Sequence, residues 1–413
     1  MRRPGSYPGE RTDVESMMEV VFVSNYINHH QLPFCRAMIA SKEVEFTFLQ
    51  MEQMDEERIG MGWDTDPSDY PFVRLYKDDP GEGQRLIDES EVVIYGGVEE
   101  ESYLEKRLTG GKLTVRYSER IYKEGQWKFI SPRGLKKKYH DHIRYRNAPV
   151  YLLCSGAYVA SDFHLIHAYP DKMYCWGYFP EFVPYDYDVL TRQKHERDTD
   201  IVEILWAGRM IDWKHPELAI RLAEDLAKKK TAFHMTMIGG GEQNARIRSM
   251  ASEKGLDSLI SFPGFLPPKE VRERMLASDI FLFTSDFKEG WGAVLNEAMN
   301  AGCAVVASSA IGAVPFLLEH DKNGMVYKNG NTEEFLRYAG ELCKDPGKRY
   351  ILGNAAYTTI ANRWNAEYAA AALIGFLKSA IIGMPEARPI GPLSKAPIIA
   401  PKKGYEYTRQ SIY

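Results

Sequence analysis

Two glutamates spaced eight residues apart, Glu289 and Glu297, lie in the segment richest in residues suited to ligand binding, 281–308. Gly290 and Gly292 follow the first glutamate, and glycine lets a backbone approach a ligand closely. Apolar runs predict a strand before this loop and a helix after it, so free amides at the helix start would face an anion such as phosphate. Glu297 could then accept hydrogen bonds from ribose hydroxyls and Glu289 from sugar hydroxyls. Considered alone, the pair could equally consist of a solvated glutamate in a loop and a glutamate on a helix face, neither of which binds a ligand.

The run EGWGAVLNEAMNAGCAVVAS resembles the E-x7-E signature and its surroundings in retaining glycosyltransferases of the large GT4-like group, which share the GT-B fold. The resemblance implies a nucleoside diphosphate sugar as donor, with UDP the commonest base, and no further cofactor. It implies a hexosyltransferase that moves a sugar to a saccharide or lipid-linked acceptor with retention of anomeric configuration. In that scheme Glu289 is a catalytic residue, and Glu297, Gly290, Gly292 and Val294 bind the donor.

Three further motifs of the same group lie upstream in the expected order. LWAGRMIDWK resembles the family's strand followed by GR-x4-K, which implies that Arg209 and Lys214 are catalytic residues that bind the donor diphosphate. Two fixed cations can neutralise a leaving diphosphate without a metal ion, which agrees with that role. IGGGE, which contains Gly240, resembles the family's glycine loop, although a tight turn would have the same sequence. Phe265, in FPGFL, falls where the family often lines its nucleobase pocket.

A pair of histidines, His29 and His30, directly follows the first predicted strand, at the sheet edge where a cleft is expected. His30 and Pro33 form an H-x-x-P spacing similar to the first loop of other GT-B transferases, and NYINHHQ is similar to the start of a bacterial GT4-like subgroup. His30 is thus a candidate catalytic residue and His29 a candidate for the acceptor side, because histidine can hydrogen-bond a sugar near neutral pH. Histidines that only stabilise the start of a helix would show the same pattern.

The later strand that ends near Tyr117 departs from the family. Many GT4-like enzymes place a histidine after this strand, near the reacting carbon, whereas this chain has Ser118, Glu119 and Arg120. Either Glu119 takes a polar role on the acceptor side, or the chemistry rests on the first loop.

Enzymes of this group are thought to react on one face of the sugar: the acceptor oxygen attacks as the diphosphate leaves, and the leaving phosphate takes the proton. No enzyme nucleophile is then needed, so catalysis depends on orientation and charge stabilisation. We expect no metal site, because the three Asp-x-Asp strings (64–66, 186–188 and 198–200) lie away from recognised strand ends. Two alternatives keep the fold: a binding or scaffold protein without turnover, and an epimerase or phosphorylase.

The run from Arg133 to Arg146 holds six lysines or arginines and one acidic residue in a chain whose net charge is -5. Its interleaved tyrosines and histidines could bind anionic lipid headgroups or a phosphate-bearing acceptor. A solvated basic face would have the same composition. Nucleic acid is not an expected partner, because the positive charge is local and no reader motif accompanies it.

The elements that must position these residues alternate between short buried strands and helices, which predicts an α/β fold with parallel sheets covered on both faces. We expect a GT-B architecture of two Rossmann-like, doubly wound domains facing one another across a cleft. Strands are expected at 19–24, 43–49, 91–95, 113–117 and 149–154, then at 201–207, 232–238, 260–262, 280–284 and 304–308. Helices are expected at 31–40, 216–229, 245–254, 269–277, 294–300 and 332–342. The expected divisions are a flexible lead (1–17), an acceptor-side domain (18–182), a linker (183–200), a donor-binding domain (201–370), and a helix end with a proline-rich tail, extended over the surface or disordered (371–413).

The composition is that of a folded protein, with 44% hydrophobic and 26% charged residues. Five cysteines are scattered without a C-x-x-C or C-x-x-H pair, which favours a reducing compartment over a zinc site or a disulfide framework. No apolar stretch follows the basic start of the chain, and none approaches the length of a membrane span. The expected location is therefore the cytoplasm, at the inner membrane face if the basic run binds lipid.

Overall fold

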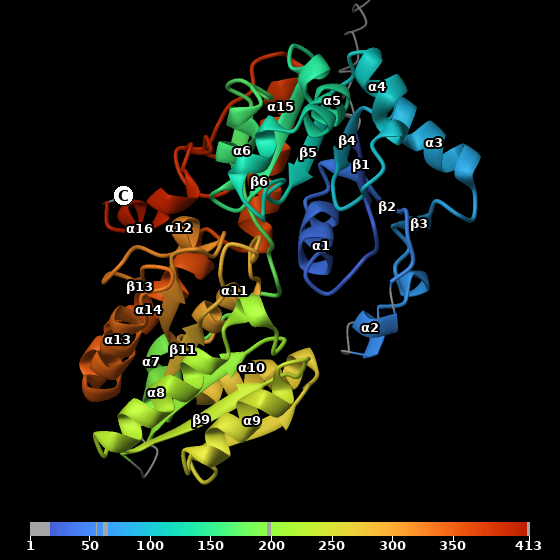
Figure 1. Ribbon diagram of the computed structural model, residues 1–413. Helices are drawn as coiled ribbons and strands as arrows, with labels where there is room; N and C mark the ends of the chain where they lie inside the picture. Colours follow the sequence, from blue (N-terminus) through green and yellow to red (C-terminus); the bar gives the residue numbers. More distant parts are fainter. Residues whose placement is uncertain (1–16, 55, 61–64, 196–199, 411–413) are drawn as a thin grey trace, which may run out of the picture.

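Two parallel β-sheets form the frame of the molecule. The computed structural model describes residues 17–54, 56–60, 65–195 and 200–410 of the chain. One sheet has seven strands in the order β3-β2-β1-β4-β5-β6-β7, and the other has six in the order β10-β9-β8-β11-β12-β13 (Figure 1). The expected pair of α/β domains is confirmed. The strands are β1 (Met18–Ser24), β2 (Val44–Gln50), β3 (Val73–Leu75), β4 (Val92–Tyr95), β5 (Thr114–Ser118), β6 (Val150–Ser155), β7 (Met173–Trp176), β8 (Val202–Ala207), β9 (Phe233–Ile238), β10 (Ile260–Gly264), β11 (Ile280–Phe283), β12 (Ala304–Ser308) and β13 (Met325–Tyr327).

Helices connect successive strands and cover the sheets in each domain. Parallel neighbours need such crossovers, because a tight turn can join only antiparallel strands. In the N-terminal domain the helices are α1 (Leu32–Ala40), α2 (Glu56–Arg58), α3 (Pro80–Glu89), α4 (Glu105–Thr109), α5 (Pro132–Asp141) and α6 (Val159–Leu165). The remaining helices are α7 (Tyr187–His195), α8 (Glu217–Lys228), α9 (Asn244–Glu253), α10 (Pro268–Ala277), α11 (Val294–Asn300), α12 (Val314–Leu317), α13 (Thr332–Lys344), α14 (Pro346–Asn362), α15 (Ala366–Ile381) and α16 (Gly404–Tyr407).

The strand order reverses once in each sheet, between β1 and β4 in the first and between β8 and β11 in the second. At such a reversal the loops after the two central strands diverge to opposite faces and leave a crevice that binds ligands. The predicted site residues follow these central strands: the histidine pair follows β1, the Arg209 and Lys214 motif follows β8, and Glu289 follows β11. The topology therefore brings motifs that are distant in sequence to facing edges of the two sheets.

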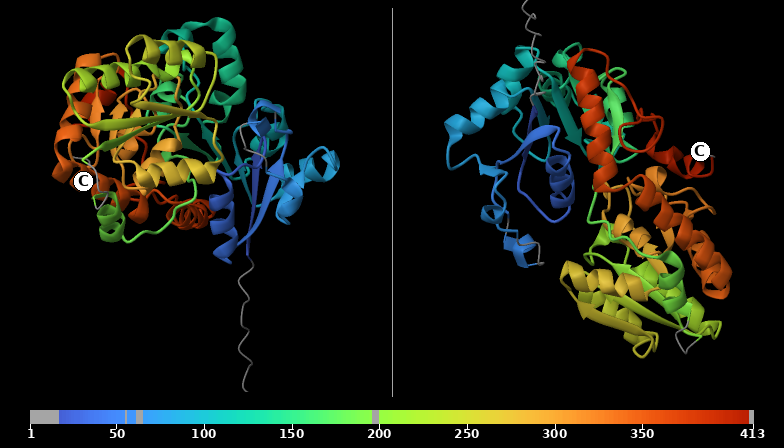
Figure 2. Two further views of the ribbon diagram at one scale, coloured as in Figure 1. Left: turned by 90° about the horizontal axis from the view of Figure 1, so that it is seen from below. Right: turned by 180° about the vertical axis from the view of Figure 1, so that it is seen from behind.

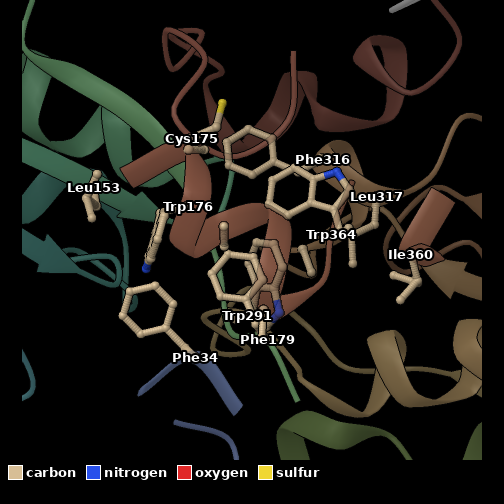
Figure 3. Close-up of a cluster of buried hydrophobic side chains, with 14 of the residues drawn as sticks. Phe34, Leu153, Cys175, Trp176, Phe179, Trp291, Phe316, Leu317, Ile360 and Trp364 are labelled. Atoms are coloured by element: carbon tan, nitrogen blue, oxygen red, sulfur yellow. The ribbon is translucent and has the colours of Figure 1, made fainter. Parts of the chain in front are cut away.

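An apolar cluster joins the two domains (Figure 3). Trp291, from the C-terminal domain, is fully buried, and a Cβ atom added to Gly177 would lie 2.3 Å from its indole ring. The Trp291 and Trp364 rings are 5.6 Å apart between centroids, and Phe179 stacks on Trp364 at 6.4 Å. The two domains thus share one core where the chain crosses between them.

Backbone contacts beside this cluster fix the second domain against the first. Ala157 N–H donates to the carbonyl of Gly312 at 2.8 Å, and the Tyr158 hydroxyl donates to the carbonyl of Ser309. A Cβ atom on Gly156 would lie 2.5 Å from the carbonyl oxygen of Gly290. Only glycine allows the two backbones to approach this closely.

The segment expected to be a linker, 183–200, contains the helix α7, which packs on the C-terminal domain. Lys194 Nζ donates to the carbonyls of Ser278 at 2.7 Å and Ala301 at 2.9 Å. The sequence showed no clean periodicity here, so this helix was not predicted. The interdomain crossover is therefore shorter than expected, and ends before Tyr187.

The C-terminal part of the chain returns to the first domain, so the expected boundary at residue 370 falls inside α15. This helix packs beside α1 (Figure 2), and the Phe376 ring lies 4.7 Å from the ring of Tyr174 between centroids. The tail after it extends over the surface, as the expected alternative of an extended segment had it. Cys175 N–H donates to the carbonyl of Ser394 at 2.8 Å, which covers the edge strand β7.

The tail then crosses back to the second domain. The guanidinium of Arg409 donates to the carbonyl of Val326 at 2.9 Å, and His320 N–H donates to the carbonyl of Thr408 at 2.8 Å. Across residues 17–54, 56–60, 65–195 and 200–410, no helix combines the length and the apolar character that crossing a membrane requires.

Replacing Trp291 with alanine should lower the free energy of unfolding by about 3–5 kcal/mol, because the change leaves a cavity in the core that the domains share. Urea denaturation followed by circular dichroism measures the loss. Trp127→Ala is the matched control, because this tryptophan is 68% exposed, and should change the free energy by less than about 0.5 kcal/mol. Equal losses from the two variants would contradict the role given to Trp291.

Candidate active site

A cavity of about 420 Å³ lies between the two domains, at the carboxyl ends of their central strands. The N-terminal domain contributes His29, His30 and Arg58 to its lining, and the C-terminal domain contributes the rest. Nine of the residues predicted from the sequence meet here. They are His29, His30, Arg209, Lys214, Phe265, Glu289, Gly292, Val294 and Glu297.

Lys214 and Glu289 form an ion pair at the base of this cavity. The distance from Lys214 Nζ to Glu289 Oε2 is 2.6 Å, and the hydroxyl of Ser285 donates to the same oxygen at 2.9 Å. The loops that carry the pair are also tied together, because the Thr284 hydroxyl donates to the carbonyl of Lys214 at 2.6 Å and Asp286 N–H donates to the carbonyl of Trp213 at 2.9 Å. A positive and a negative group are therefore held in fixed positions beside each other.

Arg209 lies two residues beyond the end of β8, on a backbone supported by the glycine loop. A Cβ atom on Gly239 would lie 2.0 Å from the carbonyl oxygen of Gly208, and Gly239 has a φ of 117°. Met210 N–H donates to the carbonyl of Gly240 at 2.6 Å. The glycines after β9 are thus needed to let this loop pack on the loop that carries Arg209.

Gly240 itself lies outside the main cavity. It lines an adjoining cavity of about 520 Å³ together with Arg209, Trp213 and Phe265. A Cβ atom on Gly240 would lie 2.9 Å from the Phe265 ring, so the glycine leaves room for that ring. Phe265 is 48% exposed and lines both cavities, which makes its face available to a flat ligand group.

Glu297 faces the cavity from the first turn of α11. Burial raises the pKa of its carboxyl to about 7, and the positive charge of Arg272 on α10 opposes this shift. The start of α11 is held by the indole N–H of Trp291, which donates to the side-chain carbonyl of Asn296 at 2.9 Å. A half-buried carboxylate of this kind is stabilised by any hydrogen-bond donor that offsets the cost of its charge, including one from a ligand.

The two histidines lie against each other, with 3.9 Å between ring centroids. Their loop is shaped by Asn28, whose side-chain oxygen accepts from His30 N–H at 3.0 Å. Burial and the charge of Arg272 lower the pKa of His29 to about 4, and burial next to His29 lowers the pKa of His30 well below its ordinary value. At neutral pH both rings are therefore uncharged, and they can act as hydrogen-bonding groups but not as cations.

Gly290 and Glu119 meet in a second, larger cleft of about 840 Å³, which continues from the cavity across the N-terminal domain. A Cβ atom on Gly290 would lie 2.1 Å from Glu119 Oε2, so this glycine leaves room for a carboxylate of the other domain. Gly290 was predicted to bind the donor, but it faces Glu119 and does not line the 420 Å³ cavity. Glu289, Arg209 and His30 line both spaces.

Several lining residues were not singled out from the sequence. Trp213 lines the main cavity, the adjoining cavity and the larger cleft. It precedes Lys214 in the motif, so its position there could have identified it as a lining residue. Arg58, whose guanidinium lies 5.4 Å from the centre of the Tyr26 ring, comes from a segment without a motif. Tyr178 lines the larger cleft from a segment that carries no local signal. The charge of Arg272 on α10 acts on His29 and Glu297.

Of the three Asp-x-Asp strings, two include residues outside the described part of the chain, 64 and 198–199. The third surrounds the start of α7, where Asp186 Oδ1 accepts from Val189 N–H at 3.1 Å and Asp188 accepts from the Tyr350 hydroxyl at 3.1 Å. Within the described ranges, no three His, Cys, Asp or Glu side chains are grouped so that they could hold a metal ion.

The basic run forms α5 and the short helix η5 (Ile143–Tyr145) after it. None of the side chains of α5 is buried. Three large apolar side chains are exposed in the same stretch: Trp127 at 68%, Ile130 at 65% and Tyr139 at 53%. Cations and exposed apolar groups thus share one surface segment, 127–146.

Residues 190–359 match the family model described as "Glycosyl transferases group 1". The chain is 29% identical over 137 residues to the amylovoran biosynthesis glycosyltransferase AmsK of Erwinia amylovora, a match that covers 32% of this chain and 33% of AmsK. It is 23% identical over 181 residues to the GDP-mannose-dependent alpha-(1-6)-phosphatidylinositol monomannoside mannosyltransferase of Mycobacterium tuberculosis, covering 42% of this chain and 47% of that protein. The matched segments span less than half the length of either relative.

Among solved structures, the chain is similar to Anabaena Alr3699/HepE in complex with UDP, with a TM-score of 0.65 and 15% sequence identity. The likeness covers 88% of this chain and 100% of that one, so it extends over both domains. At this identity the likeness concerns the fold, and it confirms the GT-B architecture expected from the motifs.

Glu297→Gln should make the chain more stable than wild type at pH 8, by about 1–3 kcal/mol, and leave its stability at pH 5 nearly unchanged. The carboxyl has a pKa of about 7 in the folded chain and about 4.5 ordinarily. Between pH 4.5 and about 7 the folded chain binds more protons at this carboxyl than the unfolded chain, so the free energy of unfolding falls as the pH rises. Urea denaturation at the two pH values measures the difference.

Glu273→Gln on α10 is the control, because this glutamate is exposed and should show no pH-dependent difference from wild type. A Glu297→Gln variant that is no more stable than wild type at pH 8 would show that the carboxyl is solvated.

Proposed function

We propose, on the premise that this chain belongs to the group 1 glycosyltransferases of GT-B fold, that it is a retaining hexosyltransferase. It moves a sugar from a nucleoside diphosphate sugar to a hydroxyl of a saccharide or lipid-linked acceptor, without a metal ion. The observation that carries the proposal is the fixed pair of Lys214 and Glu289, which lies with Arg209 in a cavity lined by both domains.

Arg209 and Lys214 suit the diphosphate of the donor. An arginine can bind two phosphate oxygens with its planar guanidinium, whereas a lysine acts as a compact positive charge. Negative charge grows on the diphosphate as it leaves, and two cations held in advance stabilise that charge without a metal ion. Glu289, whose Oε2 is held by Lys214 and Ser285, accepts hydrogen bonds from hydroxyls of the transferred sugar.

The nucleoside of the donor suits the part of the cavity lined by Glu297 and Phe265. Glu297, as a carboxylate, accepts hydrogen bonds from the two ribose hydroxyls, and the exposed face of Phe265 stacks on the base. Leu266, Pro268 and Val271 provide apolar walls beside it. UDP is the favoured base, and the GDP-mannose dependence of the mycobacterial relative makes GDP the alternative to test.

Transfer forms a bond between the acceptor oxygen and the anomeric carbon as the bond from that carbon to the diphosphate breaks. The acceptor proton passes to the leaving diphosphate. The acceptor oxygen is itself the nucleophile, so the enzyme supplies none. The neutral rings of His29 and His30 hydrogen-bond the sugar from the N-terminal domain, and catalysis comes from orientation and charge stabilisation.

The test is turnover of a panel of UDP- and GDP-sugars by the purified chain, with and without EDTA. Release of the nucleoside diphosphate from at least one donor, unchanged by EDTA, supports a metal-independent transferase. Binding of a donor without turnover would indicate a scaffold protein, and conversion of the donor to an isomer would indicate an epimerase. Inversion at the anomeric carbon of the product, followed by proton NMR, would contradict retention.

Arg209→Ala and Lys214→Ala should each lower kcat for the best donor by about 10²–10³-fold, the range seen when one charge-stabilising group is removed. Lys214→Ala also leaves Glu289 without its ion-pair partner, so its effect should be at least as large. Arg221→Ala, an exposed arginine on α8, is the matched control and should retain wild-type activity. A loss below tenfold from both site variants would show that leaving-group stabilisation lies elsewhere.

We also propose that the surface segment 127–146 binds anionic lipid at the inner face of a membrane. Basic side chains attract such a surface, and exposed aromatic side chains favour the headgroup layer. The rest of the chain is acidic overall, so this segment would set the orientation of the protein. A lipid-linked acceptor would be within reach of a protein docked in this way.

A Lys136→Glu/Lys137→Glu double variant should bind phosphatidylglycerol-containing vesicles at least about tenfold more weakly than wild type, at roughly 1 kcal/mol per basic residue. Vesicle co-sedimentation measures the affinity, with pure phosphatidylcholine vesicles as the reference. Lys228→Glu/Lys229→Glu on α8 is the matched control, since both lysines are exposed in the other domain. Equal losses in the two double variants would leave only a general charge effect and refute the proposed surface.

A further inference from the structure

Glu119, at the carboxyl end of β5, brings a carboxylate into the large cleft opposite the donor loop. It is the first residue after the strand, and it lines the 840 Å³ cleft together with Glu289 and Arg209. Oε2 of Glu119 lies so close to Gly290 that any larger residue there would collide with it. The carboxylate therefore adjoins Gly290, the residue next to Glu289, in the cleft that continues across the N-terminal domain.

Both oxygens of the Glu119 carboxylate have a partner. The Tyr178 hydroxyl donates to Oε1 at 2.9 Å, and Lys123 Nζ forms an ion pair with Oε2. A carboxylate has about four lone-pair sites, so these two contacts leave acceptor capacity for one more hydroxyl. The carboxylate is thus held in place and still able to bind a ligand.

Tyr178 reaches Glu119 from the interdomain crossover, two residues after the end of β7. Its ring packs edge-on against Tyr117 with 6.4 Å between centroids, and the Tyr117 hydroxyl interacts in turn with Gln31 and Ser24. Ser24 ends β1 and Gln31 precedes α1, so these two side chains, joined by a hydrogen bond of 3.2 Å, flank the loop that carries the histidine pair. A chain of polar contacts therefore connects the first loop, the crossover and Glu119.

The backbone on the other side of Glu119 is equally constrained. Arg120 forms two hydrogen bonds with the buried carboxylate of Asp162, at 3.1 and 3.0 Å. Asp162 also accepts from Tyr122 N–H at 3.0 Å. The segment after β5 is fixed on α6, so Glu119 has little freedom to turn away from the cleft.

We propose, building on the donor chemistry above, that Glu119 orients the acceptor hydroxyl and that Tyr178 is the positioning residue that holds Glu119 for this task. The hydroxyl donates its hydrogen bond to the carboxylate and presents a lone pair to the anomeric carbon. As the new C–O bond forms and the bond to the diphosphate breaks, the proton passes to the leaving diphosphate. Because the proton goes to the diphosphate, Glu119 acts through orientation and not as a base.

The competing explanation is that Glu119 only supports the donor loop at Gly290. Glu119→Gln separates the two, because the amide keeps the shape of the side chain and can still accept from Tyr178, but it loses the negative charge that binds a hydroxyl strongly. Two reactions are followed with the best donor: hydrolysis, in which water is the acceptor, and transfer to an alkyl glycoside. Octyl glucoside, galactoside and mannoside serve as probes, and the one used fastest by the wild type is kept.

Glu119→Gln should lower kcat/KM for the glycoside by about 10- to 100-fold and leave the Kd of the nucleoside diphosphate within about twofold of wild type. The ratio of transfer to hydrolysis should fall with it. Tyr178→Phe, which removes one hydroxyl, should show the same pattern with a smaller loss of about 3- to 10-fold. Glu124→Gln is the matched control, because this exposed glutamate also pairs with a lysine four residues later, and it should behave like wild type.

An equal loss of nucleotide affinity, hydrolysis and transfer in Glu119→Gln would show that the residue only supports the donor loop. Unchanged transfer would also overturn the proposal. A wild-type chain that turns over no donor at all would instead refute the proposed function, so the two failures are distinguishable.

Discussion

Trp291 lies between the two glycines of the donor loop, and its indole packs on Gly177, in the segment where the chain crosses between domains. One fully buried side chain thereby fixes the loop that carries Glu289 and joins the hydrophobic cores of the two domains. Its indole N–H also holds the start of α11, and with it the position of Glu297. The geometry of the donor cavity depends on the position of Trp291, because Glu289 lies in the same loop and Glu297 lies in the helix turn that the indole N–H holds.

The charges around the cleft are arranged in pairs. Lys214 faces Glu289 and Lys123 faces Glu119, while Arg120 is bound to Asp162. Each pair holds its members in place before a ligand arrives, which reduces the cost of ordering them during the reaction. The uncharged histidines line the same cavity as Arg209 and Lys214, the two cations proposed to bind the diphosphate.

Much of the fold follows from the sequence, because strands buried on both faces appear as short, continuous apolar runs. The ten expected strands are all present, and α11 spans the expected residues. The strands that were not predicted, β3, β7 and β13, have three or four residues each and lie at the edges of the sheets. The long helix α14 and the return of α15 to the first domain were not predicted, since they depend on contacts with distant parts of the chain. Only a helix end within 371–413 was expected there.

In the candidate site, too, residues in local motifs could be predicted, whereas residues placed by distant contacts could not. Arg209, Lys214, Glu289 and Glu297 could be named because each belongs to a motif of local sequence, and the structure brings them together around one cavity. Their individual roles stay predictions. Arg58 and Tyr178 reach the cleft only through tertiary structure. Gly240 and Gly290 were predicted to bind the donor. They border spaces next to the main cavity, and the room they leave is taken by Phe265 and Glu119.

The most direct test of this account is a crystal structure of the chain with bound UDP. The account predicts that the diphosphate lies within hydrogen-bonding distance of the side chains of Arg209 and Lys214, with the ribose hydroxyls on the carboxylate of Glu297. A nucleotide bound in the cleft of the N-terminal domain, or a diphosphate turned away from both cations, would contradict it.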